Sequence, residues 1–112
     1  MAVTIYHNPR CTKSRQTLQL LRDRGIEPTV VEYLKEPPDA KALSGLLKKL
    51  GVQPKDLIRP KEHRALGLPE TDDAQELITR MATHPEIIER PIVVSGGKAR
   101  LGRPPEAVLE IL

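Results

Sequence analysis

The spacing of apolar residues divides the chain into short strand-like runs and longer helical runs. Residues 3–6 are rich in β-branched and aromatic side chains, which is typical of a strand. Two leucines then share one face of a helix that we expect over residues 14–24, and Gly25 favours the end of that helix. Residues 29–34 are apolar enough for a second, buried strand, and a right-handed crossover would place it parallel to the first.

The middle of the chain has the pattern of a helical block. Asp39 is a good N-cap, and four leucines follow it at helical spacing. A short helix with proline in its first turn is expected over residues 54–58. Thr71 or Asp72 can cap a further helix, in which apolar residues recur at helical spacing over residues 74–81.

The last part of the chain predicts a hairpin and a closing helix. Residues 90–95 have the composition of a strand that begins at a proline, and Gly96 and Gly97 suit a two-residue turn. Residues 98–101 form the returning strand, and two prolines then lead into a helix.

The resulting order is strand, helix, strand, helical block, two strands and helix. This order resembles that of thioredoxin- and glutaredoxin-like α/β proteins, which have a mixed four-stranded sheet. A length of 112 residues suits one domain, and 38% hydrophobic with 29% charged residues is a globular composition. We therefore expect a single thioredoxin-like domain over residues 1–112, with a helical insertion over about residues 35–90.

Charge and cysteine content narrow the function. The formal net charge of +3 suits an anionic small molecule, and no long basic run or aromatic–basic interleaving suggests nucleic acid. One cysteine excludes an internal disulfide, and no histidines, cysteines or carboxylates have metal-ligand spacing, so we expect no metal site. With no leader pattern and no long apolar run, we expect a soluble, cytoplasmic protein that does not enter the membrane, and a monomer.

Cys11 carries the candidate chemistry. It lies on a predicted strand-to-helix turn, where unpaired backbone N–H groups and the helix dipole favour a thiolate. Arg10, Lys13 and Arg15 add positive charge nearby, and His7 can add more. Such a setting lowers a thiol pKa from about 8.5 and also favours anion binding. The alternative is that Cys11 is a small buried apolar residue.

Four segments of the chain resemble the arsenate reductases that are coupled to glutathione and glutaredoxin, and more closely their short, arsenate reductase-like branch. The segments keep the order and spacing of that family. They are residues 6–15, 57–59, 89–94 and 102–104.

The resemblance implies a role for individual residues. Cys11 corresponds to the nucleophile, and Arg59, Arg90 and Arg103 correspond to three arginines that surround the oxyanion. His7 corresponds to a histidine that assists thiolate formation. The arginines also suit the chemistry, because planar guanidinium groups bind tetrahedral oxyanions through two bonds at once, which lysine cannot do.

Further residues of the matched segments are expected to support the site. They are Asn8, Ser14, Arg15 and Pro91, and the thioredoxin-like fold implies a cis peptide bond before Pro91.

The resemblance also implies a reaction in which no cofactor is bound. The Cys11 thiolate attacks arsenate, glutathione serves as co-substrate and attacks the arsenylated cysteine, and glutaredoxin removes the glutathione so that arsenite is released. The expected partners are thus arsenate or a similar oxyanion, glutathione and glutaredoxin. A single cysteine agrees with an external reductant, because the chain has no internal resolving thiol.

Two other functions remain open. Relatives of this fold bind RNA polymerase and often use a Cys-x-x-Cys redox pair. Because Ser14 stands three residues after Cys11, such a regulator would be redox-silent here. The other alternative is a general glutathione-dependent thiol oxidoreductase, which an assay with a disulfide substrate separates from the arsenate reductase.

Overall fold

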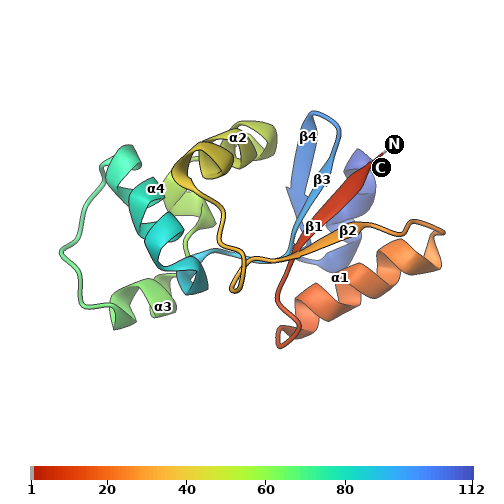
Figure 1. The fold of residues 1–112 in the computed structure, drawn as a ribbon, viewed down its shortest axis with the longest axis horizontal. Helices are drawn as coiled ribbons and strands as arrows, with labels where there is room; N and C mark the ends of the chain where they lie inside the picture. The colour runs from red at the N-terminus through yellow and green to blue at the C-terminus, as the bar shows by residue number, and fades with distance from the viewer. Residues whose placement is uncertain (1) are drawn as a thin grey trace. The chain divides into compact units, whose positions relative to one another are not determined.

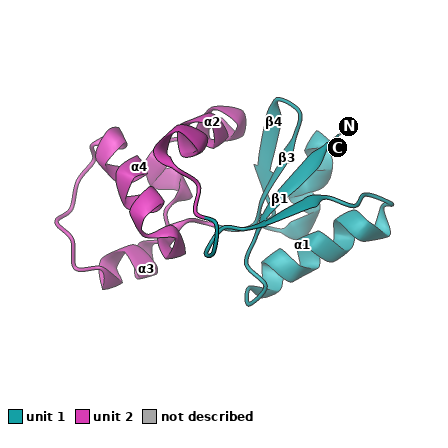
Figure 2. Cartoon of the chain, viewed as in Figure 1, with its two compact units in different colours: residues 1–36, 90–112 teal, residues 37–89 magenta. Residues whose placement is uncertain are grey.

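The chain forms two compact units. The computed structural model describes residues 2–112, and Figure 2 distinguishes one unit of residues 1–36 and 90–112 from a second unit of residues 37–89. The second unit has nearly the bounds of the predicted helical insertion. That the whole chain acts as a single domain stays a prediction.

The first unit is built on a four-stranded mixed sheet (Figure 1). The strand order is β2-β1-β3-β4, with β2 parallel to β1 and the other neighbours antiparallel. This topology confirms the predicted thioredoxin-like fold class. The strands are β1 (Val3–His7), β2 (Thr29–Glu32), β3 (Ile92–Ser95) and β4 (Lys98–Leu101).

The core of the first unit covers one face of β1. Alternation along β1 buries Val3, Ile5 and His7 on one face, as expected for a strand with one covered side. The first two join a cluster with residues from α1 (Thr12–Asp23) and the 3₁₀-helix η3 (Pro105–Ile111). His7 continues the same face and so points toward the start of α1. The closing helix that the sequence predicts is present as η3, a 3₁₀-helix rather than an α-helix.

Strand β2 differs from the prediction of a buried strand. It is parallel to β1 as expected, but it lies at the edge of the sheet, and Val30 is 37% exposed. An apolar run predicts a strand equally well at the centre and at the edge of a sheet, because the run itself says nothing of how many neighbours the strand has.

The second unit is helical. Its elements are α2 (Ala40–Leu50), η1 (Pro54–Leu57), α3 (Pro60–Ala65), α4 (Ala74–Thr83) and η2 (Pro85–Ile87). As predicted, α2 begins at Asp39, whose side chain accepts a hydrogen bond from Ala42 N at 2.8 Å. Helix α4 is capped by Asp73 rather than by Thr71 or Asp72. No residue of α3 is buried, so its sequence has no periodic apolar residues from which the helix could be predicted.

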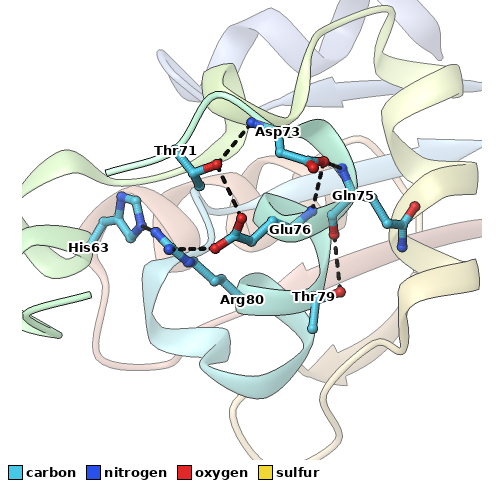
Figure 3. A network of polar contacts seen from close by, with 7 residues as sticks. All are labelled: His63, Thr71, Asp73, Gln75, Glu76, Thr79 and Arg80. Carbon is cyan, nitrogen blue, oxygen red and sulfur yellow. Dashed lines mark hydrogen bonds and ion pairs between the residues drawn. The ribbon is translucent and has the colours of Figure 1, made fainter. Parts of the chain in front are cut away.

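A polar network joins α3 and α4 in the second unit (Figure 3). Arg80 is 6% exposed, and its Nη2 donates to Glu76 Oε1 at 2.9 Å. Its Nη1 lies 3.1 Å from His63 Nε2. Thr71 Oγ1 in turn donates to Glu76 Oε2 at 3.2 Å. His63, which the sequence suggests to be a surface residue, is therefore half-buried beside Arg80.

Replacing Arg80 is expected to destabilise the fold. Arg80→Met keeps much of the buried stem but removes the charge-assisted bond to Glu76 and the contact with His63. We expect the free energy of unfolding to fall by about 1–3 kcal/mol. Urea denaturation followed by circular dichroism measures this, with Arg64→Met on the exposed face of α3 as the matched control. Equal stability of the two variants would contradict a structural role of the network.

No helix among residues 2–112 is both long and apolar enough to cross a membrane.

Candidate active site

Cys11 lies at the junction between β1 and α1. It is the N-cap residue of α1, with an extended backbone, and its N–H donates to Asn8 O at 3.0 Å. The Asn8 side chain also closes the turn, since its Oδ1 accepts from Arg10 N at 3.0 Å. Asparagine favours such turns because its side chain can bond to the backbone two residues on. This loop thus places Cys11 at the N-terminus of α1, as predicted.

Ser14 ties the end of β1 to the start of α1. Its side chain is completely buried, and its Oγ accepts a hydrogen bond from Asn8 N at 3.0 Å. The same Oγ lies 2.6 Å from Nδ1 of His7, a residue that is 6% exposed. Buried polar groups need such partners, and these bonds fix the first turn of α1 relative to the strand.

The surroundings of His7 disfavour its charged form. Burial lowers its pKa, Glu32 opposes this by raising it, and the charges of Arg22 and Arg15 lower it further, so that the net pKa lies below the ordinary value. This direction works against the expectation that His7 adds positive charge, because a buried imidazole loses the solvation of its charged form. Its direct contact is with Ser14, which makes His7 a residue that positions the helix start.

The thiol of Cys11 is acidic. Partial burial raises its pKa, but the Ser14 N–H, the Arg90 guanidinium and the Lys13 N–H together lower the pKa below the ordinary value. The two N–H groups belong to the first turn of α1, where backbone donors have no partner within the helix. The helix start and one distant arginine therefore produce the shift.

Positive side chains close to Cys11 in sequence act differently from the prediction. Arg15 donates to Pro9 O at 2.9 Å and to Thr12 Oγ1 at 3.3 Å, and so braces the turn. Arg10 and Lys13 are exposed, and Lys13 affects the thiol through its backbone N–H. Solvent and salt screen the charges of side chains that extend into water, so exposure weakens their effect on the Cys11 sulfur.

Two of the predicted arginines lie beside Cys11. Arg90 stands just before β3, and its guanidinium is close enough to the Cys11 side chain to lower the pKa of the thiol. Arg103 follows β4, and its Nη2 lies 3.8 Å from Cys11 Sγ. Its Nε donates to Arg90 O at 2.8 Å, so the two arginine segments are also joined directly.

Both arginines precede cis peptide bonds. The Arg90–Pro91 bond is cis, which confirms the prediction for Pro91. The Arg103–Pro104 bond is cis as well, which the sequence analysis missed. The prolines themselves were visible, but nothing in the local pattern separates a cis from a trans X–Pro bond.

Arg59 belongs to the second unit. An isolated bridge between Ile58 and Ile88 orders its backbone. Its Nε is paired with Glu62, and its Nη1 donates to Glu89 Oε1 at 2.7 Å. Burial lowers the pKa of Arg59, but its pairs with the two carboxylates outweigh this and raise the pKa above the ordinary value. The structure thus groups Cys11, Arg90 and Arg103, while the convergence of Arg59 with them stays a prediction.

The arrangement around Cys11 suits an anion. A sulfur with a lowered pKa stands beside two guanidinium groups and the N-terminus of a helix, and such groups stabilise negative charge. Within residues 2–112, no group of three or more His, Cys, Asp or Glu side chains could hold a metal ion.

The acidity of Cys11 can be measured by thiolate absorbance against pH, with Cys11→Ser as the blank. Because the folded pKa is depressed, the thiolate persists below the ordinary pKa of about 8.5 and is lost only as the pH falls through the folded pKa. Arg90→Gln removes a charge that lowers this pKa and is expected to raise it. Arg100→Gln, an exposed arginine of β4, is the control. A pKa of about 8.5 or higher in the unaltered protein would contradict the described electrostatics.

Comparison with known proteins identifies related chains. An uncharacterized Escherichia coli protein, YfgD, is 54% identical, over 98% of this chain and 96% of its own length. An arsenate reductase from Haemophilus influenzae is 46% identical, over the whole length of both chains. The solved structure of an arsenate reductase from Vibrio cholerae has a TM-score of 0.93 and 46% identity, and covers 100% of this chain and 98% of its own.

A family model supports the same relationship. The model of the ArsC family matches residues 6–111, a range that includes the end of β1, the Cys11 turn and both arginine segments of the first unit. Because this match and the relatives extend over almost the whole sequence, they concern the complete fold and its candidate site together. The chain belongs to the ArsC family.

Proposed function

We propose that the protein is an arsenate reductase, in which the Cys11 thiolate is the nucleophile and glutathione and glutaredoxin supply the external thiols. The observation that carries the proposal is the placement of Arg103 Nη2 3.8 Å from a Cys11 sulfur whose pKa is lowered by Ser14 N–H and Arg90 against the opposing effect of burial. Similarity to proteins named arsenate reductase, at 46% identity, supports the substrate.

The first step joins arsenic to sulfur. The tetrahedral oxyanion binds with its oxygens toward the guanidinium groups of Arg90 and Arg103, and the Cys11 thiolate attacks arsenic. An S–As bond forms, an As–O bond breaks, and the departing oxygen leaves as water after taking up protons. Fixed positive groups assist this step, because they offset the repulsion between a thiolate and an anion.

The second stage supplies the electrons. Glutathione attacks the Cys11 sulfur of the arsenylated cysteine and forms a disulfide with it, while the S–As bond breaks. The electron pair of that bond reduces As(V) to As(III), and arsenite is released. A glutaredoxin thiol then attacks the glutathione sulfur of the disulfide and removes the glutathione, which restores Cys11. Overall, one arsenate and two thiols give one arsenite, one disulfide and one water.

The composition supports an external reductant. Cys11 is the one cysteine of the chain, so the second thiol of each turnover must come from another molecule. Reduced glutathione and glutaredoxin require a reducing compartment, and we therefore assign the reaction to the cytoplasm.

Arg59 is proposed as a third ligand of the oxyanion. Glu62 and Glu89 hold its Nε and Nη1, and Nη2 takes part in neither of these two pairs. Such a clamp fixes the plane of the guanidinium group and directs its remaining donors. His7, Asn8, Ser14, Arg15 and Pro91 are proposed as supporting residues that hold the Cys11 turn and the Arg90 segment.

The proposal predicts arsenate-dependent oxidation of NADPH in a coupled assay with glutathione, glutaredoxin and glutathione reductase. Cys11→Ser is expected to abolish this activity, because the hydroxyl of serine is not ionised near pH 7. Thr12→Ser, a mild change at the neighbouring exposed position, is the control. Activity of Cys11→Ser equal to that of the control would overturn the mechanism.

Replacing each arginine separately by lysine tests the anion site. Lysine keeps the charge but loses the planar fork, so turnover of the Arg90→Lys and Arg103→Lys variants should fall by about 10²-fold. Arg59→Lys should have an effect of the same kind if Arg59 reaches the oxyanion. Arg100→Lys, outside the proposed site, should retain activity. Full activity of all three site variants would exclude this arginine cluster.

The same preparations separate the alternatives. Turnover of a glutathione mixed disulfide without any arsenate reduction would identify a general thiol oxidoreductase. Retention of RNA polymerase in a pull-down, with neither activity, would identify a redox-silent regulator.

A further inference from the structure

We propose that Gly102 is a positioning residue, which brings Arg103 to Cys11 because its Cα packs directly against Thr17 of α1 and Pro91. This inference rests on the proposed anion site and extends it to a residue that touches neither the sulfur nor the oxyanion.

The contact leaves no room for a side chain. A Cβ atom on Gly102 would lie 2.7 Å from Pro91 Cγ and 3.1 Å from Thr17 Cγ2, and closer still to Thr17 Oγ1. Real Cβ atoms do not approach other atoms to within 3.0 Å. The other six glycines would each place a Cβ with nothing within 4 Å, so Gly102 is distinguished by packing.

The reason is steric and does not lie in the backbone conformation. The φ of Gly102 is outside the left-handed region that favours glycine, in contrast to Gly25, Gly51, Gly67 and Gly96. An alanine could therefore adopt the backbone of Gly102, and its methyl group alone would create the conflict.

The opposing side of the contact is rigid. Thr17 is completely buried, and its Oγ1 donates to Lys13 O at 2.8 Å. The Pro91 ring is buried, and Pro91 O accepts a hydrogen bond from Gly102 N at 3.0 Å. A methyl group on Gly102 would therefore displace the segment after β4, which continues into the exposed Arg103, more readily than the buried partners.

Arg103 depends on the position of that segment. It is the next residue after Gly102, and its Nε donates to Arg90 O at 2.8 Å while its Nη2 lies 3.8 Å from Cys11 Sγ. An outward displacement of its Cα would lengthen both distances. The close approach of Gly102 to α1 therefore determines whether the second guanidinium group reaches the sulfur.

The acidity of Cys11 has several sources that a movement of Arg103 leaves in place. Burial opposes it, and Ser14 N–H, the Arg90 guanidinium and Lys13 N–H lower the pKa. A change that moves Arg103 should therefore weaken anion binding while the thiol pKa stays below the ordinary value. This combination distinguishes a positioning role from a general loss of structure, which would alter both.

The experiment measures how strongly arsenate protects Cys11 from alkylation by iodoacetamide, without glutathione. Gly102→Ala is compared with Gly97→Ala, a glycine of the β3–β4 turn where a Cβ meets nothing within 4 Å. We expect Gly102→Ala to require about tenfold more arsenate for half-protection, which corresponds to the loss of one charge-assisted hydrogen bond. Gly97→Ala should match the unaltered protein.

The thiol pKa, from the pH dependence of alkylation without arsenate, should stay below the ordinary value in all three.

Equal protection of Gly102→Ala and the unaltered protein would overturn the inference, and so would a thiol pKa that rises to the ordinary value in Gly102→Ala. If arsenate does not protect the unaltered protein, the anion site itself fails, and with it the proposed function. That result is distinct from a failure of Gly102 alone.

A second pair of variants tests the contact from the side of α1 and replaces Gly102→Ala if that protein does not fold. Thr17→Ala removes the two atoms that a Cβ on Gly102 would meet on α1 and leaves the Pro91 contact. The double variant Thr17→Ala/Gly102→Ala should need more arsenate than Thr17→Ala, but less than tenfold more, with a thiol pKa that stays below the ordinary value. Identical protection of these two variants would contradict the proposed packing role.

Discussion

The structure around Cys11 depends on one buried hydroxyl group. Ser14 Oγ accepts a hydrogen bond from Asn8 N and contacts His7 Nδ1, and its side chain is completely buried. It therefore joins the last residue of β1 to the first turn of α1. This link keeps the Ser14 and Lys13 N–H groups directed at the sulfur, where they lower the thiol pKa against the cost of burial.

The β3–β4 hairpin positions the two arginines that lie beside Cys11. β3 begins just after Arg90, and β4 ends just before Gly102 and Arg103, so the antiparallel pairing of Ile92 with Leu101 brings both arginines to the same end of the sheet. The bond from Arg103 Nε to Arg90 O joins them. The grouping of Cys11, Arg90 and Arg103 thus follows from the register of one hairpin together with one strand-to-helix turn.

The sequence predicted these parts to different degrees. Strands β1, β3 and β4 and helices α1, α2 and α4 have clear apolar periods or caps, and the Cys11 turn could be located from them. The exposed edge position of β2, the short helix α3 and the lowered pKa of His7 could not be located from the sequence, because they depend on tertiary neighbours. Likewise, Gly102 has no signal in the sequence beyond its place before Arg103, since only the approach of Thr17 shows that a Cβ is excluded.

The central claim is that an oxyanion binds at the Cys11 sulfur between arginine side chains. A crystal structure of the protein soaked with arsenate, and recorded at the arsenic absorption edge, tests this claim most directly. We predict an arsenic position at Cys11 Sγ, with oxygens bonded to the guanidinium groups of Arg90 and Arg103. Arsenic bound elsewhere, or a Cys11 site that stays empty while arsenate occupies another part of the surface, would contradict it.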